Sequence, residues 1–312
     1  MNIIVHSIEI VAPLLLLVGL GAFINLNNRL STVTINEISF LVSKVFLPAT
    51  IFINVYNSNI KEDFDLKLLV FLTFIFILAS SINIFYINSF VKDNKTKAVL
   101  LQASIRSNCT LFALPLAINI AGLSIAGITS LAAVIVTNLN NLYCIYIFER
   151  FQIKNHKLSF ILIRVLKHPL TVGLLLGLIT QALNIKLPYV IVKFVSDVAK
   201  ITSPIALIII GASFIFKQNK ETVRHMSLAI LYKLVLYPAL GLLLAITLGF
   251  RNQALVVILA LSASPVAINS YLTAKEYDCD VDLANATLVY SYIISLITLP
   301  MFISLVKFMN LI

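Results

Sequence analysis

Long apolar segments separated by short polar stretches dominate the chain. A helix needs about 20 apolar residues to cross the roughly 30 Å hydrocarbon core of a bilayer, and ten segments have about that length. They lie at residues 7–25, 36–57, 67–91, 98–121, 124–148, 162–183, 188–216, 224–249, 252–274 and 283–308. The pattern therefore predicts an all-α polytopic membrane protein with ten transmembrane helices.

The segments form two related halves, residues 1–150 and 151–312. At an offset of 156, features of the first half recur in the second: Pro13 and Gly21 as Pro169 and Gly177, and Lys44 and Pro48 as Lys200 and Pro204. The sequence PLAIN at Pro115 in the fourth segment recurs as PVAIN at Pro265 in the ninth, at an offset of 150. A repeat of five spans inserts its second copy upside down, and inverted repeats are typical of secondary transporters. We therefore predict two inverted five-helix repeats.

Composition and charge agree with a membrane protein. Hydrophobic residues make up 60% of the 312 positions and charged residues only 12%, whereas a soluble domain carries about 25% charged residues. The net charge of +10 lies mostly between the segments, so it indicates membrane orientation rather than nucleic-acid binding. With the N-terminus outside, thirteen Lys and Arg fall in inside loops and five in outside segments. This predicts that both termini are extracytoplasmic. No Lys or Arg precedes Arg29, so we interpret the first segment as a retained span rather than a signal peptide.

Pro115 and Pro265 mark the strongest candidate site. A lone intramembrane proline is more often a kink, but a repeat-matched pair surrounded by small polar residues predicts two broken helices that cross near the membrane midplane. The amino-terminal ends of their second halves would present free N–H groups, which attract anions. The neighbouring polar residues are Ser104, Ser107, Asn108 and Asn119 in the fourth segment, and Ser262, Ser264, Asn269 and Ser270 in the ninth.

Other polar residues within the segments allow two kinds of role. Arg106 would either contact the substrate or snorkel to the lipid headgroups. Snorkelling is the favoured role for Lys44 and Lys200, and Lys233 could be a structural charge partner. Intramembrane asparagines commonly join helices through hydrogen bonds, and some of them are candidates for ligand contact. The full candidate substrate-binding set is Asn108, Arg106, Ser107, Pro115, Pro265, Asn269, Asn141 and Asn54.

Buried carboxylates are missing from this set. No Asp or Glu lies securely within a segment, and Asp197 comes closest. Cation transporters commonly rely on such groups, so their absence favours an anion. The three cysteines form neither a disulfide framework nor a metal spacing, and no catalytic motif is present. We therefore expect no enzyme activity, no metal and no cofactor, and leave proton or sodium coupling open.

Several short motifs resemble the auxin efflux carrier family, which includes plant PIN-FORMED carriers and bacterial malate or malonate permeases. The resemblance covers nearly the whole chain. The motifs are FLPA at 46–49, NCTLFALP at 108–115, TSPIA at 202–206, GAS at 211–213, AKEY at 274–277 and TLP at 298–300.

The resemblance implies a scaffold part and a mobile part, with the substrate carried in an elevator-like movement beside two crossed helices. The resemblance implies that Asn108 contacts the substrate and that Pro115 and Pro265 lie where the two broken helices cross. The central loop is far shorter than in plant carriers, and Ser270 replaces their second proline, which disfavours auxin. The resemblance therefore implies a permease of the cell membrane for a small organic anion, such as malate or malonate.

Two alternatives stay open: a sodium-coupled symporter resembling the bile acid type, and a non-transporting membrane sensor on the same scaffold. The expected partners are the small anion and membrane lipid, without nucleic acid. A homodimer through the scaffold part is compatible with the resemblance.

Overall fold

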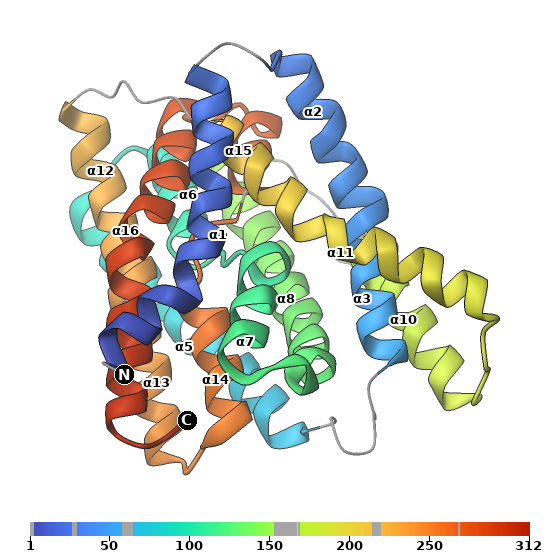
Figure 1. Ribbon diagram of the computed structural model, residues 1–312. Coiled ribbons are helices and arrows are strands. Elements are labelled where there is room, and N and C mark those ends of the chain that lie inside the picture. The colour runs from blue at the N-terminus through green and yellow to red at the C-terminus, as the bar shows by residue number, and fades with distance from the viewer. Residues whose placement is uncertain are drawn as a thin grey trace.

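The computed structural model describes residues 3–26, 30–57, 65–152, 167, 169–213, 220–267 and 269–312 (Figure 1). The α-helices are α1 (Ile3–Leu26), α2 (Thr32–Leu41), α3 (Leu47–Tyr56), α5 (Leu66–Phe90), α6 (Asn94–Ala103), α7 (Leu114–Ala121), α8 (Ala126–Gln152), α10 (Pro169–Ala182), α11 (Tyr189–Ala212), α12 (Lys220–Leu231), α13 (Tyr237–Thr247), α14 (Asn252–Ala263), α15 (Asn269–Glu276) and α16 (Val281–Phe308). Three π-helical turns, η1 (Val42–Phe46), η2 (Cys109–Ala113) and η4 (Tyr232–Leu236), and one 3₁₀ turn, η3 (Leu123–Ile125), connect some of them. Over the described residues, the prediction of an all-α fold is confirmed.

Six helical stretches are long and apolar enough to cross a membrane. They are Val33–Tyr56, Leu66–Phe90, Leu123–Phe148, Tyr189–Ala212, Lys220–Thr247 and Val281–Phe308. The other four predicted segments coincide with shorter apolar helices, at Ala12–Leu26, Cys109–Ala121, Thr171–Ala182 and Asn252–Ala263. Two of these four are short because the fourth and ninth segments are interrupted, and most of the start of the sixth segment lies outside the described residues.

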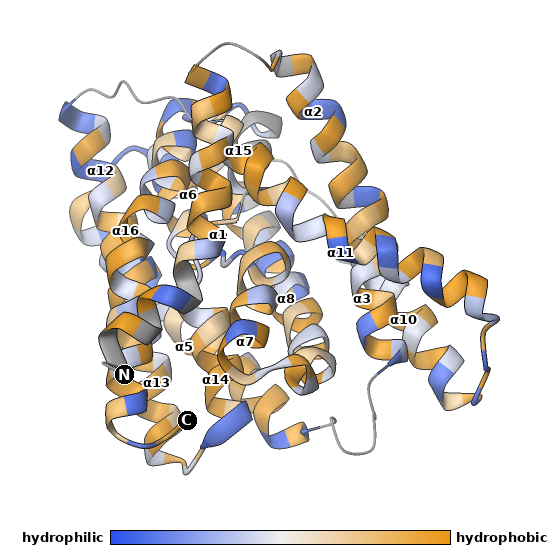
Figure 2. Cartoon of the chain, viewed as in Figure 1, coloured by the Kyte–Doolittle hydropathy of each residue, from blue (hydrophilic) through white to orange (hydrophobic). Residues whose placement is uncertain are grey.

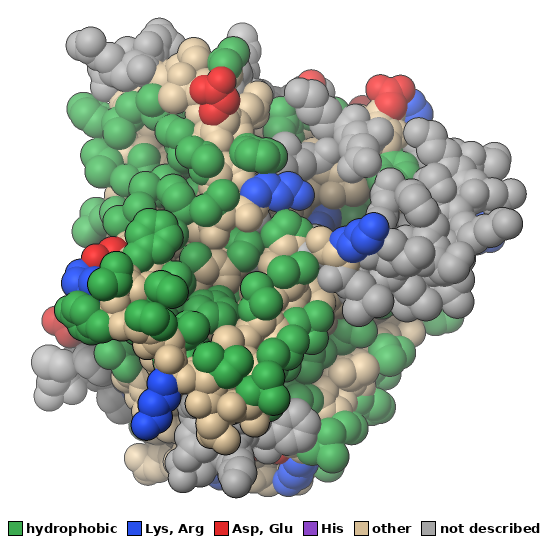
Figure 3. Space-filling view, turned by 90° about the vertical axis from the view of Figure 1, so that its right-hand side faces the viewer, with side chains coloured by type: hydrophobic (Ala, Val, Ile, Leu, Met, Phe, Trp, Pro, Cys, Tyr) green, Lys and Arg blue, Asp and Glu red, His purple; other side chains and the backbone are tan. Residues whose placement is uncertain are grey.

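Apolar side chains cover much of the outer surface. Orange, hydrophobic residues run along most of the helices in Figure 2, and hydrophobic side chains spread over the face seen in Figure 3 with few charges among them. Leu16, Phe85 and Ile297 are each more than 70% exposed. Exposed apolar area of this extent is unfavourable in water and indicates contact with lipid.

Glycines join one group of helices closely. A Cβ atom added to Gly21 in α1 would lie 1.9 Å from the carbonyl oxygen of Ile208 in α11, and one added to Gly211 would lie 1.9 Å from the carbonyl oxygen of Val18. Gly173 in α10 meets the backbone of Pro48 in α3 in the same way, at 2.5 Å. Only a hydrogen atom fits at these positions, so the backbones touch. We call α1, α2, η1, α3, α10 and α11 the glycine-packed group.

The 156-residue offset of the sequence recurs in these contacts. Gly21 packs against Ile208, and Gly177 packs against Phe52, so both partners are shifted by 156. The hydroxyl of Thr202 also donates to the carbonyl oxygen of Phe46, which is its own counterpart at that offset, over 3.3 Å.

The remaining helices surround the two interruptions and form what we call the crossing group: α5, α6, η2, α7, α8, α12, η4, α13, α14, α15 and α16. In Figure 1, α2, α3, α10 and α11 lie together on the right, while α12, α13 and α16 lie on the left. The start of α1 and the end of α16 lie at the same end of the molecule. The candidate site lies between the two groups.

Candidate functional site

Two non-helical stretches meet inside the crossing group. Residues 104–108 separate α6 from η2, and residues 264–267 follow the end of α14. The backbone N–H of Asn108 donates to the carbonyl oxygen of Pro265 over 2.9 Å, and that of Ala267 donates to the oxygen of Arg106 over 3.0 Å. Ser107 and Val266 thereby form an antiparallel bridge. This pairing satisfies backbone groups that a break in a membrane helix would otherwise leave without partners.

The two prolines predicted to mark these breaks do not occupy equivalent places. Pro265 lies in the second interruption, but Pro115 lies near the start of α7, seven residues after Asn108. The bridge joins residues 159 apart, whereas the proline match has an offset of 150. The prediction of a matched proline pair is therefore wrong. η2 and α7 form one continuous helix, Cys109–Ala121, so Pro115 lies inside it and not at the interruption of residues 104–108. The π-helical turn just before Pro115 accommodates its missing N–H.

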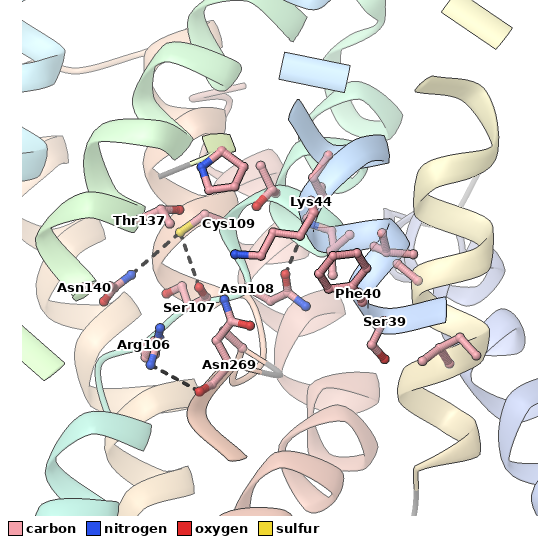
Figure 4. Close-up of a pocket in the computed structure, with 18 of the residues that line it drawn as sticks. Ser39, Phe40, Lys44, Arg106, Ser107, Asn108, Cys109, Thr137, Asn140 and Asn269 are labelled. Carbon is pink, nitrogen blue, oxygen red and sulfur yellow. Dashed lines mark hydrogen bonds between the residues drawn. The ribbon is translucent and has the colours of Figure 1, made fainter. Parts of the chain in front are cut away.

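A cavity of about 510 Å³ lies beside the bridge (Figure 4). Residues from Arg106 to Leu111, with Ala267 and Asn269, form its wall on the crossing side. The glycine-packed group contributes α2 and η1, Pro169 of α10, and part of α11. The volume suits a small molecule rather than a polymer or a bare ion.

Arg106 is held in this wall by neutral groups. Its side chain is only 7% exposed. One terminal nitrogen donates to Thr273 Oγ1 over 3.0 Å and to the carbonyl oxygen of Asn269 over 3.3 Å, and the other donates to Asn141 Oδ1 over 2.8 Å. Among the described side chains, no carboxylate forms an ion pair with it. Its charge therefore faces the cavity without a described acidic partner.

Lys44 reaches the cavity from the opposite group. It lies in η1, and Figure 4 shows its ammonium end directed towards the residues of the bridge. Lys44 is exposed and also lines the cavity, so the position is compatible with both snorkelling and ligand contact. A π-helical turn accommodates one more residue than an α-helical turn and so rotates the side chains within it, a shift that α-helical periodicity does not reveal.

The described lining is cationic. It contains Lys44 and Arg106 and no Asp or Glu. Two polar atoms in this wall, Ser107 Oγ and Asn140 Oδ1, have no hydrogen-bond partner among the described residues, and both side chains are only 3% exposed. Buried polar atoms normally have partners, so these two indicate room for a polar ligand or water.

Asn108 lines the cavity, yet both ends of its amide are occupied. Its Oδ1 accepts from the backbone N–H of Leu111 over 3.2 Å and so caps η2, while its Nδ2 donates to the hydroxyl of Tyr292 over 2.6 Å. Asn108 thus links the start of η2 to α16. It shapes the site, and its second N–H and second oxygen lone pair are still available for a ligand.

The other predicted residues divide between the cavity and its surroundings. Ser107 and Asn269 line it. Asn141 does not line the cavity but accepts a hydrogen bond from Arg106. Asn54 donates to Ser130 Oγ over 3.2 Å and so joins α3 to α8. Pro115 and Pro265 do not line it. Prediction from the sequence missed the polar residues that neighbouring helices contribute: Asn36, Ser39, Thr137 and Asn140.

Comparison with known proteins gives one positive finding. A family model described as "Membrane transport protein" matches residues 6–303. No curated protein matches the chain.

Proposed function

Since the chain belongs to the membrane transport protein family, the family of auxin efflux carriers, we propose that it is a permease for a small organic anion, with a carboxylate such as malate or malonate as substrate. The observation that carries the substrate class is the cavity beside the bridge. Its described lining holds Lys44 and Arg106 and no acidic residue. An anion gains attraction there, whereas a cation is repelled by both charges.

The same proposal includes ten spans in two inverted repeats, residues 1–150 and 151–312, with both termini outside the cell membrane. The 156-residue offset between the contacts of Gly21 and Gly177 supports the repeat. The antiparallel bridge between the fourth and ninth segments supports the inversion, since an in-plane twofold axis brings equivalent segments together in opposite directions.

We also propose an elevator-type mechanism of alternating access. The cavity lies between the glycine-packed group and the crossing group, and its walls come from both. The close backbone contacts of Gly21, Gly173 and Gly211 support a rigid glycine-packed group. Movement of the crossing group against it would carry Arg106 and the bridge past Lys44 and expose the anion to each side in turn.

Uptake into proteoliposomes tests the substrate class. We expect labelled malate or malonate to accumulate or exchange, and unlabelled small carboxylates to compete. Choline and glycerol serve as the cationic and neutral controls and are expected not to compete. If no carboxylate in the panel is transported, or choline is transported instead, the proposed function fails.

Replacing Lys44 with glutamine is expected to raise the KM for a dicarboxylate about tenfold, which corresponds to about 1.4 kcal/mol. The reason is the loss of one of two cations that line the cavity. Lys200→Gln is the matched control, because Lys200 is the counterpart of Lys44 in the second half, does not line the cavity, and pairs with Asp197 at 3.6 Å. Concentration-dependent uptake measures both. Equal KM values for the two variants would exclude Lys44 from the site.

A further inference from the structure

Lys233 is a charged residue that the proposed site does not use. It lies in η4, its side chain is 0% exposed, and it does not line the cavity. Its Nζ donates to the carbonyl oxygen of Ser262 over 2.5 Å and lies 5.1 Å from the ring centre of Tyr237. No described carboxylate forms an ion pair with it. Burying an ammonium group in this way is costly unless the surroundings are electronegative.

Ser262 supplies such surroundings. It lies one residue before the end of α14, just ahead of the second interruption. The last carbonyl groups of a helix have no partner within it and carry about half a negative charge. Side chains satisfy two of them here: Ser264 Oγ donates to the oxygen of Ala260, and Lys233 donates to that of Ser262. In secondary transporters with broken helices, such carbonyl ends commonly coordinate the coupling cation.

The first broken helix has the same arrangement without the charge. Ser104 Oγ donates to the oxygen of Leu100 near the end of α6, and Asn83 Nδ2 in α5 donates to that of Leu101 over 2.9 Å. Asn83 is as fully buried as Lys233 and lies in the third predicted segment, as Lys233 lies in the eighth. A neutral amide is therefore sufficient for the hydrogen bond. The ammonium group at the second position adds charge, not merely a donor.

We propose that the Lys233 ammonium group takes the place of a coupling cation at the carboxyl end of α14, so that transport does not require Na⁺. This inference rests on the proposed anion permease. The charge is covalently attached to the crossing group and travels with it. In this structure it offsets the partial negative charge at the end of α14, and it would offset part of the charge of the anion during the movement. A Na⁺ ion would have to displace Lys233 from Ser262 to bind at the same carbonyl.

The first test compares uptake by the wild-type protein in Na⁺ and in choline, with the same anion on the same vesicles. We expect rates that agree within about twofold. A loss of tenfold or more without Na⁺ would overturn the inference and leave the proposed function intact. Absence of anion uptake in both media would instead overturn the proposed function.

The second test uses Lys233→Ser, which removes the charge and leaves space and an oxygen beside Ser262. We expect uptake in choline to fall about tenfold and Na⁺ to restore part of it, since a small cation can now bind there. Asn83→Ala is the matched control, because it removes a neutral donor from a carbonyl near the end of the other broken helix and should respond equally to both cations. A folded Lys233→Ser protein with wild-type uptake in choline would overturn the inference.

Discussion

Replacing Arg106 with glutamine is expected to lower anion uptake about a hundredfold while the protein remains folded. The guanidinium group lines the cavity, is nearly buried, and has no described acidic partner. A bound carboxylate would therefore meet a charge that is desolvated and already positioned. Removing one member of such a buried pair typically costs about 2–5 kcal/mol, and a hundredfold change corresponds to about 2.7 kcal/mol.

The structural cost of this substitution is limited. The carbonyl oxygen of Asn269 keeps a partner, because Thr273 Oγ1 donates to it over 2.7 Å. Asn141 Oδ1 loses its partner, so Asn141→Ala is a useful control that keeps the charge but frees one side of the guanidinium group. We expect it to lower uptake about tenfold. An Arg106→Gln protein that transports as well as the wild type would exclude Arg106 from substrate binding.

The second large effect is expected on stability, from Gly21→Ala. The added methyl group would lie 1.9 Å from the carbonyl oxygen of Ile208 and 2.9 Å from the backbone nitrogen of Ala212. Neither backbone atom can move alone, so α1 and α11 must separate. Overpacking of this kind costs about 3 kcal/mol, which corresponds to a fall of about 5 °C in Tm for a chain of this size.

Gly19→Ala in the same helix is the matched control, because nothing lies within 4 Å of the added methyl group. It should leave Tm unchanged or raise it slightly, since alanine is the better helix former. Thermal unfolding of both purified variants in detergent measures the difference. Equal Tm values would show that α1 and α11 do not touch through Gly21. The reciprocal variant Gly211→Ala should resemble Gly21→Ala, because Val18 approaches it in the same way.

Hydrophobic periodicity and repeat spacing predicted the helices well, because both depend on local sequence. The 156-residue offset of the sequence also appears between the contacts of Gly21 with Ile208 and of Gly177 with Phe52. The offset of 150 was misleading, since PLAIN and PVAIN resemble each other without lying at equivalent places. Pro115 lies inside the continuous helix Cys109–Ala121, where the preceding π-helical turn accommodates its missing N–H, so it does not mark the interruption.

The composition of the cavity could be predicted only in part. Arg106, Ser107 and Asn269 flank the interruptions, so their polarity within apolar segments was a sufficient signal. Lys44 comes from a distant helix, and a π-helical turn determines which way it faces. Asn108 was identified as a site residue for its place beside the break. Its capping bond to Leu111 is local, but its bond to Tyr292 depends on a tertiary contact.

Equilibrium binding of labelled malonate or malate to the purified protein tests the central claim most directly, namely that an organic anion occupies the cavity beside the bridge of Ser107 and Val266. The account predicts saturable binding that small carboxylates displace, that choline and glycerol do not displace, and that Arg106→Gln abolishes while Lys200→Gln preserves it. Binding that is unchanged in a folded Arg106→Gln protein would contradict it.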